Sequence, residues 1–272
     1  VENTPKIIGG MTATCFELSK SLYSLSVGEV IKVSSPTAAE MVKLLENTFR
    51  AVNIGLVNEI ALVANKLNLD VWEIIEAAAS KPFGFMPFYP GPGVGGHCIP
   101  VDPYYMMQRA QEVGVPAELI TAARAVNRMM PKHVSGVLRD LLYQSGVAAG
   151  EGRVLFLGWS YKAGVGDARE TPAEPLSENL KDAGISISTW DPYLAASDIP
   201  EGIEVIEDLA NASGFDMVVL ATAHKECVEI DWSGLLGRMR TPILYDGRRV
   251  LDLDAMQAMG WKANAVGSPA QY

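Results

Sequence analysis

The sequence lacks what disulfide-rich, zinc-binding and secreted proteins require. Only three cysteines and three histidines occur among 272 residues, and the cysteines lie far apart without a CxxC pair. These features exclude a disulfide framework, argue against a metal site and are typical of a reducing compartment. Neither a basic leader followed by an apolar run nor an uncharged apolar stretch of about 18 residues is present, so no membrane partner is predicted.

Positive charge is also scarce. The chain has 22 lysines and arginines against 32 acidic residues, which gives a formal net charge of -10 and a pI near 4.9. Nucleic acids and anionic membranes repel such a protein, so neither is expected as a partner. A phosphate-bearing ligand would have to be bound by local lysines and arginines. With 49% hydrophobic residues, the composition predicts a globular cytoplasmic protein.

The pattern of apolar residues divides the chain into three parts. Residues 1–35 predict a strand, a helix and a strand, too little for a core of their own, and we interpret them as the end of a larger α/β domain that begins before Val1. Residues 36–148 predict only helices. Residues 149–272 alternate strands with helices, which is typical of a doubly wound parallel sheet. The predicted fold class is therefore α/β with an all-α central domain.

The central part begins with a long helix. Ser35 can cap it and Pro36 can occupy its first position, and apolar residues recur at helical spacing to about Leu67. A helix of this length, about 45 Å, typically spans two domains or forms a dimer interface. Further helices are expected at residues 70–79, 103–113, 116–127 and 131–145.

A loop rich in glycine and proline, Pro90 to Tyr105, contains one cysteine, Cys98. Its composition excludes a helix or a central strand. Its glycines would let backbone amides approach an anion, and Cys98 lies just before an expected helix start at Asp102. From the loop alone, a reactive thiol and a structural turn with a buried cysteine both remain open.

Basic residues cluster in two loops after expected strands, where parallel sheets bind their ligands. Lys162 and Arg169 precede a helix in one loop, which suits phosphate. In the other, Arg248 and Arg249 follow the strand that ends at Asp246, and planar guanidinium groups suit phosphate or carboxylate. Solvated loop charges are the alternative in both cases.

The long helix carries a third set of polar residues. Lys43 and Asn47 share one helix face, and Arg50 lies one turn further on. The alternative is an exposed ion pair between Lys43 and Glu46.

Four segments together resemble the UDP-glucose/GDP-mannose dehydrogenase family of NAD-dependent nucleotide-sugar 6-dehydrogenases. They are GPGVGGHCIPVDPYY around Cys98, AEMVK through Asn47 on the long helix, the segment from Gly158 to Pro172, and DGRRV from Asp246. The histidine before the cysteine and the PVDPYY that follows are similar to the branch that acts on UDP-N-acetylhexosamines. Relatives specific for UDP-glucose often carry a lysine where Val101 stands and a serine or similar residue in place of His97.

The resemblance implies three domains: an NAD-binding Rossmann domain ending in residues 1–35, a central dimerising domain at 36–148, and a Rossmann-like UDP-sugar-binding domain at 149–272. The NAD fingerprint and the catalytic glutamate of the family would then lie before Val1. No dehydrogenase activity is expected of this chain alone. NAD is the implied cofactor, no metal is implied, and the implied partners are a UDP-sugar and a second copy of the chain.

The resemblance also implies site roles. Cys98 would be the nucleophile that carries a C6 alcohol through a thiohemiacetal and a thioester to the acid. Lys43 and Asn47 would stabilise the oxyanion, and Asp102 would help to position or activate water. The substrate would be bound by Lys162, Arg248, Gly95 and Tyr89, and Arg169 would reach towards NAD.

Three alternatives accompany this interpretation. The chain could be a non-catalytic fragment that binds a UDP-sugar and dimerises, or its substrate could be UDP-glucose. A thiol hydrolase that uses Cys98 with His97 is disfavoured, because adjacent loop residues rarely face each other and no orienting partner is evident.

Overall fold

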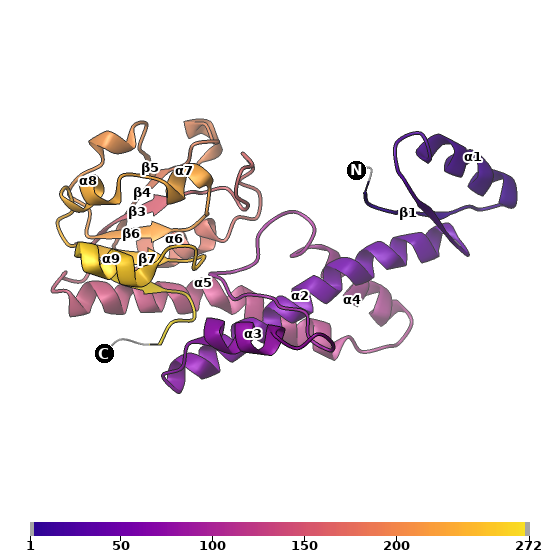
Figure 1. Cartoon of the computed structure of the whole chain (residues 1–272), viewed down its shortest axis with the longest axis horizontal. Coiled ribbons are helices and arrows are strands. Elements are labelled where there is room, and N and C mark those ends of the chain that lie inside the picture. Colours follow the sequence, from indigo (N-terminus) through magenta and orange to yellow (C-terminus); the bar gives the residue numbers. More distant parts are fainter. Residues whose placement is uncertain (1–2, 270–272) are drawn as a thin grey trace.

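The computed structural model describes residues 3–269. Figure 1 shows a long helix, α2 (Pro36–Lys66), with a small β–α–β unit at one end and a larger sheet at the other. The small unit consists of β1 (Lys6–Gly9), α1 (Ala13–Tyr23) and β2 (Val30–Val33), and its two strands are parallel. The predicted start of α2 is confirmed: the Ser35 hydroxyl accepts the Ala38 N–H at 3.1 Å, and Pro36 is the first helical residue.

Three more helices complete the central part. They are α3 (Val71–Ala79), α4 (Asp102–Glu112) and α5 (Glu118–Gln144). The prediction of two separate helices over 116–145 was wrong, because α5 continues through Pro131. A proline inside a helix costs about 3 kcal/mol, and the burial of Pro131 in a helix that packs against both α2 and α6 offsets this cost.

The C-terminal part is a six-stranded sheet in which all paired strands are parallel, as predicted. The strands are β3 (Arg153–Leu157), β4 (Ser186–Trp190), β5 (Glu204–Val205), β6 (Met217–Leu220), β7 (Ile243–Asp246) and β8 (Lys262–Ala265). Their order is β5-β4-β3-β6-β7-β8. The order reverses between β3 and β6, and ligands of open parallel sheets bind at the carboxyl ends of strands at such a switch point.

Helices cover both faces of this sheet (Figure 1). Val154 and Phe156 of β3 pack on the face covered by α5 and α6 (Ala173–Lys181). Leu155 and Leu157 pack on the opposite face, with α8 (Trp232–Leu236) and α9 (Leu253–Met259). Two-sided burial explains why the strands read as continuous apolar runs.

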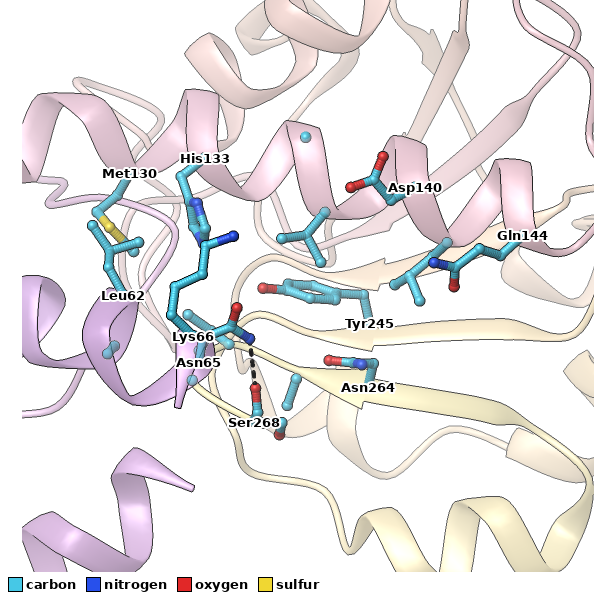
Figure 2. A pocket seen from close by; sticks show the side chains of 17 residues that line it. Leu62, Asn65, Lys66, Met130, His133, Asp140, Gln144, Tyr245, Asn264 and Ser268 are labelled. Carbon is cyan, nitrogen blue, oxygen red and sulfur yellow. Dashed lines mark hydrogen bonds between the residues drawn. The ribbon is translucent and has the colours of Figure 1, made fainter. Parts of the chain in front are cut away.

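The sheet is joined to the central helices by a polar seam. Asn65 of α2 donates to the Ser268 carbonyl at 3.1 Å, and the Trp72 indole of α3 donates to the Val266 carbonyl at 2.8 Å. Figure 2 shows the Asn65 contact at the edge of a cavity of about 260 Å³ between α2, α5, β7 and β8. None of the predicted site residues lines this cavity, so the cavity is not part of the predicted site.

Candidate active site

The loop predicted to carry the chemistry is the residue 80–101 connection between α3 and α4. Its middle is anchored by a chain of buried amides: the Gly91 N–H donates to the Asn58 side chain at 3.0 Å, Asn58 donates to Asn127 at 2.9 Å, and Asn127 donates to the Ala51 carbonyl at 2.8 Å. Asn58 and Asn127 lie on α2 and α5. Sequence reasoning missed both, although asparagines inside otherwise apolar helix faces are a usable signal.

The glycines of this loop allow it to lie against the sheet domain. A Cβ on Gly95 would be 2.7 Å from the Pro172 ring, and one on Gly96, whose φ is +92°, would be 2.7 Å from the Tyr161 ring. Any side chain at these positions would clash with Pro172 or Tyr161. Backbone groups of Gly95 and Gly96 are thus held beside the loop that follows β3.

Cys98 is exposed, so the alternative of a buried structural cysteine is wrong. Its carbonyl accepts the Asp102 N–H at 2.8 Å, where α4 begins. The Asp102 carboxylate accepts from the Asn47 amide of α2, and the Asn47 carbonyl accepts from Arg50. The structure therefore brings Cys98, Asp102 and Asn47 together across two helices.

Lys43 lies on α2 one turn before Asn47 and is exposed. Within residues 3–269 no ion pair joins it to Glu46, which removes the alternative offered by the sequence. Its ammonium group is therefore available to a ligand near the Asn47–Asp102 pair.

Arg169 is an exposed cation in the loop that follows β3. Its guanidinium group pairs with Asp167 at 2.6 Å. The Arg169 pKa is raised, first by the hydrogen bond to Asp167 and then by the charges of Asp167, Tyr161 and Cys98. Arg169 is thus an exposed cation whose guanidinium group is oriented by Asp167.

Arg248 follows β7 and is half-buried. Its Nε donates to the Ala221 carbonyl at 2.7 Å, and its backbone N–H donates to Asp246 at 2.8 Å. A Cβ on Gly91 would lie 3.6 Å from its Nη1. Burial lowers the Arg248 pKa, and the charge of Asp246 opposes this. Arg248 is therefore a fixed cation that joins the sheet edge to the glycine loop, and the alternative of an exposed basic turn is wrong for this residue.

Lys162 and Tyr89 are the two remaining predicted site residues. Lys162 is exposed in the loop after β3. Tyr89 stacks on Trp72 with ring centroids 4.9 Å apart. It lines a cavity of about 400 Å³ with Arg249 and residues of α3, and none of the other residues to which the resemblance gives a site role lines this cavity. Cys98 does not line this cavity, so the cavity does not bring Tyr89 and Cys98 together.

The loops that meet at the site are matched by models of one known family. The chain matches the central domain of the UDP-glucose/GDP-mannose dehydrogenase family over residues 37–129 and the UDP binding domain of the same family over residues 155–253. The chain belongs to the UDP-glucose/GDP-mannose dehydrogenase family. The two matched segments contain Cys98 and Arg248 respectively, so the glycine loop and the sheet edge that meet in the structure come from different domains of this family.

Among named family members, the UDP-N-acetyl-D-mannosamine dehydrogenase of Pyrococcus horikoshii is 37% identical over 90% of this chain and 56% of its own length. A solved structure of the UDP-D-ManNAc dehydrogenase from P. horikoshii superposes with a TM-score of 0.82 over 98% of this chain and 60% of that one, at 33% identity. The UDP-N-acetyl-D-glucosamine 6-dehydrogenase of Pseudomonas aeruginosa is 34% identical over 93% of this chain and 60% of its own length. The chain thus spans less than two thirds of these relatives.

Membrane-spanning helices and metal clusters are both absent from residues 3–269. No helix there is both long and apolar enough to cross a bilayer. In the same range, no three side chains of the His, Cys, Asp and Glu types gather in a way that could ligate a metal ion.

Proposed function

We propose that this chain supplies the cysteine-bearing central domain and the UDP-sugar-binding domain of an NAD-dependent UDP-sugar 6-dehydrogenase. The observation that carries the proposal is the exposed Cys98, whose carbonyl accepts the N–H of Asp102, the residue that pairs with Asn47, in a loop whose Gly91 lies against the Arg248 guanidinium group. An exposed thiol in a loop that also meets a fixed cation at the carboxyl edge of the sheet suits covalent catalysis on a nucleotide sugar. Both named relatives act on UDP-N-acetylhexosamines, which supports a substrate of that class.

In this proposal the Cys98 thiolate adds to the C6 aldehyde, which forms the S–C bond and places negative charge on the former carbonyl oxygen. The Lys43 ammonium stabilises that oxyanion. Oxidation of the thiohemiacetal gives a thioester, water cleaves it to the carboxylate, and the thiol is released. Asp102 orients the water. Asn47, which is fully buried and donates to Asp102, fits the role of holding that carboxylate in place.

NAD⁺, when bound, supplies the acceptor for the hydride lost in each oxidation. The residues present fit one side of such a site: Arg169 is exposed, and its side-chain hydrogen bonds go to Asp167. An exposed guanidinium group in this position suits a pyrophosphate. We propose that the remaining contacts come from an NAD-binding domain to which residues 3–33 belong, and that turnover needs this domain.

A thiol-protection experiment tests the substrate site on this chain alone. Cys15 and Cys98 are exposed whereas Cys227 is buried, so a Cys15→Ser variant leaves Cys98 as the reactive thiol. We expect UDP-N-acetylmannosamine or UDP-N-acetylglucosamine to slow iodoacetamide labelling of Cys98 by about tenfold or more, because a bound sugar covers the thiol. UDP-glucose should protect less, and protection by UDP-glucose alone would favour that substrate. Equal labelling with every nucleotide sugar would contradict the proposal.

A homodimer through α2 is the second part of the proposal. Large apolar side chains recur every three, four or seven residues along one side of this helix and are at least 39% exposed: Met41, Leu45, Phe49, Leu56, Ile60, Val63 and Leu67. A contiguous apolar stripe of this length favours a protein interface. We expect a dimer in sedimentation velocity at micromolar concentration, and a monomer when Leu56 and Ile60 are both replaced by aspartate. A wild-type monomer would contradict this assignment.

A further inference from the structure

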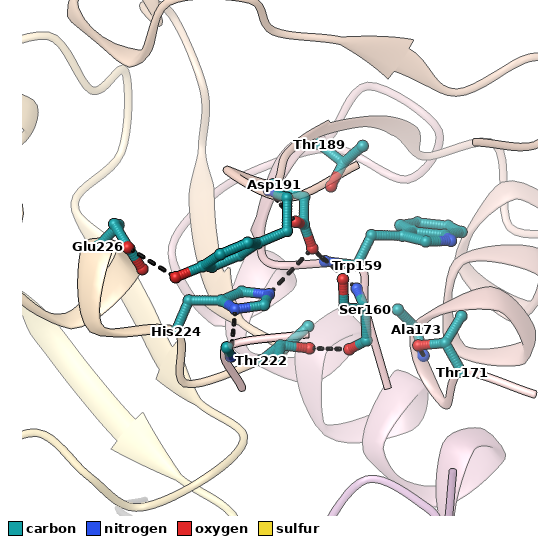
Figure 3. Close-up of polar contacts among 12 residues, drawn as sticks. Trp159, Ser160, Thr171, Ala173, Thr189, Asp191, Thr222, His224 and Glu226 are labelled. Atoms are coloured by element: carbon teal, nitrogen blue, oxygen red, sulfur yellow. Dashed lines mark hydrogen bonds and ion pairs between the residues drawn. The ribbon is translucent and has the colours of Figure 1, made fainter. Parts of the chain in front are cut away.

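The loop that carries Lys162 and Arg169 is held by His224, which forms a buried hydrogen-bonded pair with Asp191. His224, at the start of α7 (Lys225–Val228), lies with its Nε2 3.1 Å from Oδ2 of Asp191, which follows β4. The two side chains are 0% and 1% exposed. Figure 3 shows the imidazole ring between Asp191 and the loop after β3. The sequence assigned no chemical role to His224.

The hydrogen bonds of His224 fix its tautomer. The Gly164 N–H donates to Nδ1 at 3.0 Å, so Nδ1 acts as an acceptor and carries no proton. Nε2 therefore carries the proton and donates to Asp191. The two ring nitrogens thus have different partners, since Nε2 binds Asp191 and Nδ1 binds the loop two residues after Lys162.

Asp191, which accepts from Nε2 of His224, is itself held by backbone N–H groups. Its Oδ2 accepts the Trp159 and Ser160 N–H groups at 2.7 and 2.8 Å, and its Oδ1 accepts the Tyr193 N–H at 2.9 Å. Burial opposes ionisation of Asp191, but the hydrogen bonds from His224 and these N–H groups outweigh it and hold its pKa below the ordinary value. The carboxylate therefore stays charged and joins the beginning of the loop to the imidazole.

The loop depends on this contact because it has few others. Within the described residues 3–269, the Gly164–His224 bond is the one hydrogen bond made by residues 162–166. These residues are exposed, and the loop closes on itself through the Tyr161 N–H to the Asp167 carbonyl at 2.9 Å. Without the imidazole, nothing but the closure at Tyr161 and Asp167 and the packing of Gly166 against Tyr193 would limit the position of Lys162.

We infer that His224 is a positioning residue for UDP-sugar binding: its Nδ1 holds Gly164 so that the Lys162 ammonium is presented to the diphosphate. The inference rests on the proposed function and adds to it a residue that never touches the ligand. If His224 had a purely structural role, loss of the hydrogen bond of either ring nitrogen would lower the stability equally. Neither loss would then affect the affinity for UDP more than the other.

A matched pair of variants separates the two nitrogens. In His224→Gln the side-chain amide reaches the position of Nε2 and can donate to Asp191, but Gly164 loses its acceptor. In His224→Asn the side-chain carbonyl occupies the position of Nδ1 and can accept from Gly164, but Asp191 loses a donor. Each variant gives up one buried hydrogen bond, so the melting temperatures should fall by similar amounts.

UDP affinity, measured by isothermal titration calorimetry on this chain, should distinguish them. We expect the Gln variant to bind UDP about tenfold more weakly than the wild type and the Asn variant to stay within about threefold. Lys162→Ala should weaken UDP binding in the wild-type and Asn backgrounds and have little further effect in the Gln background, because Lys162 is already misplaced there.

Three outcomes would overturn the inference while leaving the proposed function intact: equal affinity in both variants and the wild type, equal weakening of both, or additive effects of Lys162→Ala and His224→Gln. If the wild-type chain does not bind UDP, the proposed function fails instead. If either variant does not fold, hydrogen–deuterium exchange of the wild type decides. The Gly164 amide should exchange more slowly than its neighbours and more slowly still with UDP, and rapid exchange at Gly164 would contradict the inference.

Discussion

Replacement of Cys98 by serine is expected to reduce formation of the uronic acid at least about a thousandfold in a complete enzyme, meaning this chain together with an NAD-binding domain. An alcohol is a poorer nucleophile than a thiolate, and an ordinary ester hydrolyses more slowly than a thioester. UDP-sugar affinity should change little, because serine keeps the size of the side chain and the Cys98 carbonyl still accepts the Asp102 N–H that starts α4.

The measurement combines two readings. NADH formation and acid product are followed with the UDP-N-acetylhexosamine substrate, and affinity is measured separately by calorimetry. Cys15→Ser is the matched control, because Cys15 is also an exposed cysteine but lies on α1, and it should keep wild-type turnover. Uronic acid formed by Cys98→Ser at the wild-type rate would remove the nucleophile assignment and leave the chain as a UDP-sugar-binding module.

Local signals in the sequence were sufficient for most of the fold. Ser35 and Pro36 define the start of α2 by capping chemistry that needs no tertiary partner, and the two-sided apolar runs of β3, β6 and β7 are typical of buried parallel strands. Pro131 was misleading, because the rule that proline starts or breaks a helix is a local one. The buried position of Pro131 within α5 overrides that rule. Strand β5 has two residues, too few for any periodic signal.

The candidate site was less predictable than the fold, since spacing reveals residue types but not their contacts. The pattern of Lys43 and Asn47 predicted a shared helix face, but the contact between Asn47 and Asp102 joins residues 55 positions apart. His224 and Asp191 lie in loops after expected strands, where parallel sheets bind their ligands, but the sequence does not show that the two side chains contact each other. The buried Asn58–Asn127 contact that anchors Gly91 has the same origin: it depends on how α5 packs against α2.

Replacement of Arg248 by alanine is expected to weaken UDP binding by about 1.5–3 kcal/mol, the usual range for a lost hydrogen bond to a charged group. At 25 °C this corresponds to an increase in Kd of roughly 10- to 150-fold. The reason is geometric: the guanidinium group is fixed by the Ala221 carbonyl at the carboxyl edge of the sheet and lies against Gly91, so a diphosphate at this edge meets a preorganised cation. Arg248→Lys should recover only part of the affinity, because an ammonium group cannot bind both the carbonyl and a phosphate in the same fork geometry.

Arg249 provides the control for this experiment. It is the next residue in the chain and also an arginine, but it pairs with Asp70 at 2.9 Å and donates to Ser268 in the seam between α3 and β8. Arg249→Ala should therefore lower the melting temperature and leave UDP affinity within about twofold, whereas Arg248→Ala should show the larger loss of affinity. The opposite ranking in calorimetry would mean that the diphosphate lies on the Arg249 side, in the cavity with Tyr89 and Trp72. Tyr89 would then belong to the substrate site, and Arg248 would lose its proposed role in binding the diphosphate.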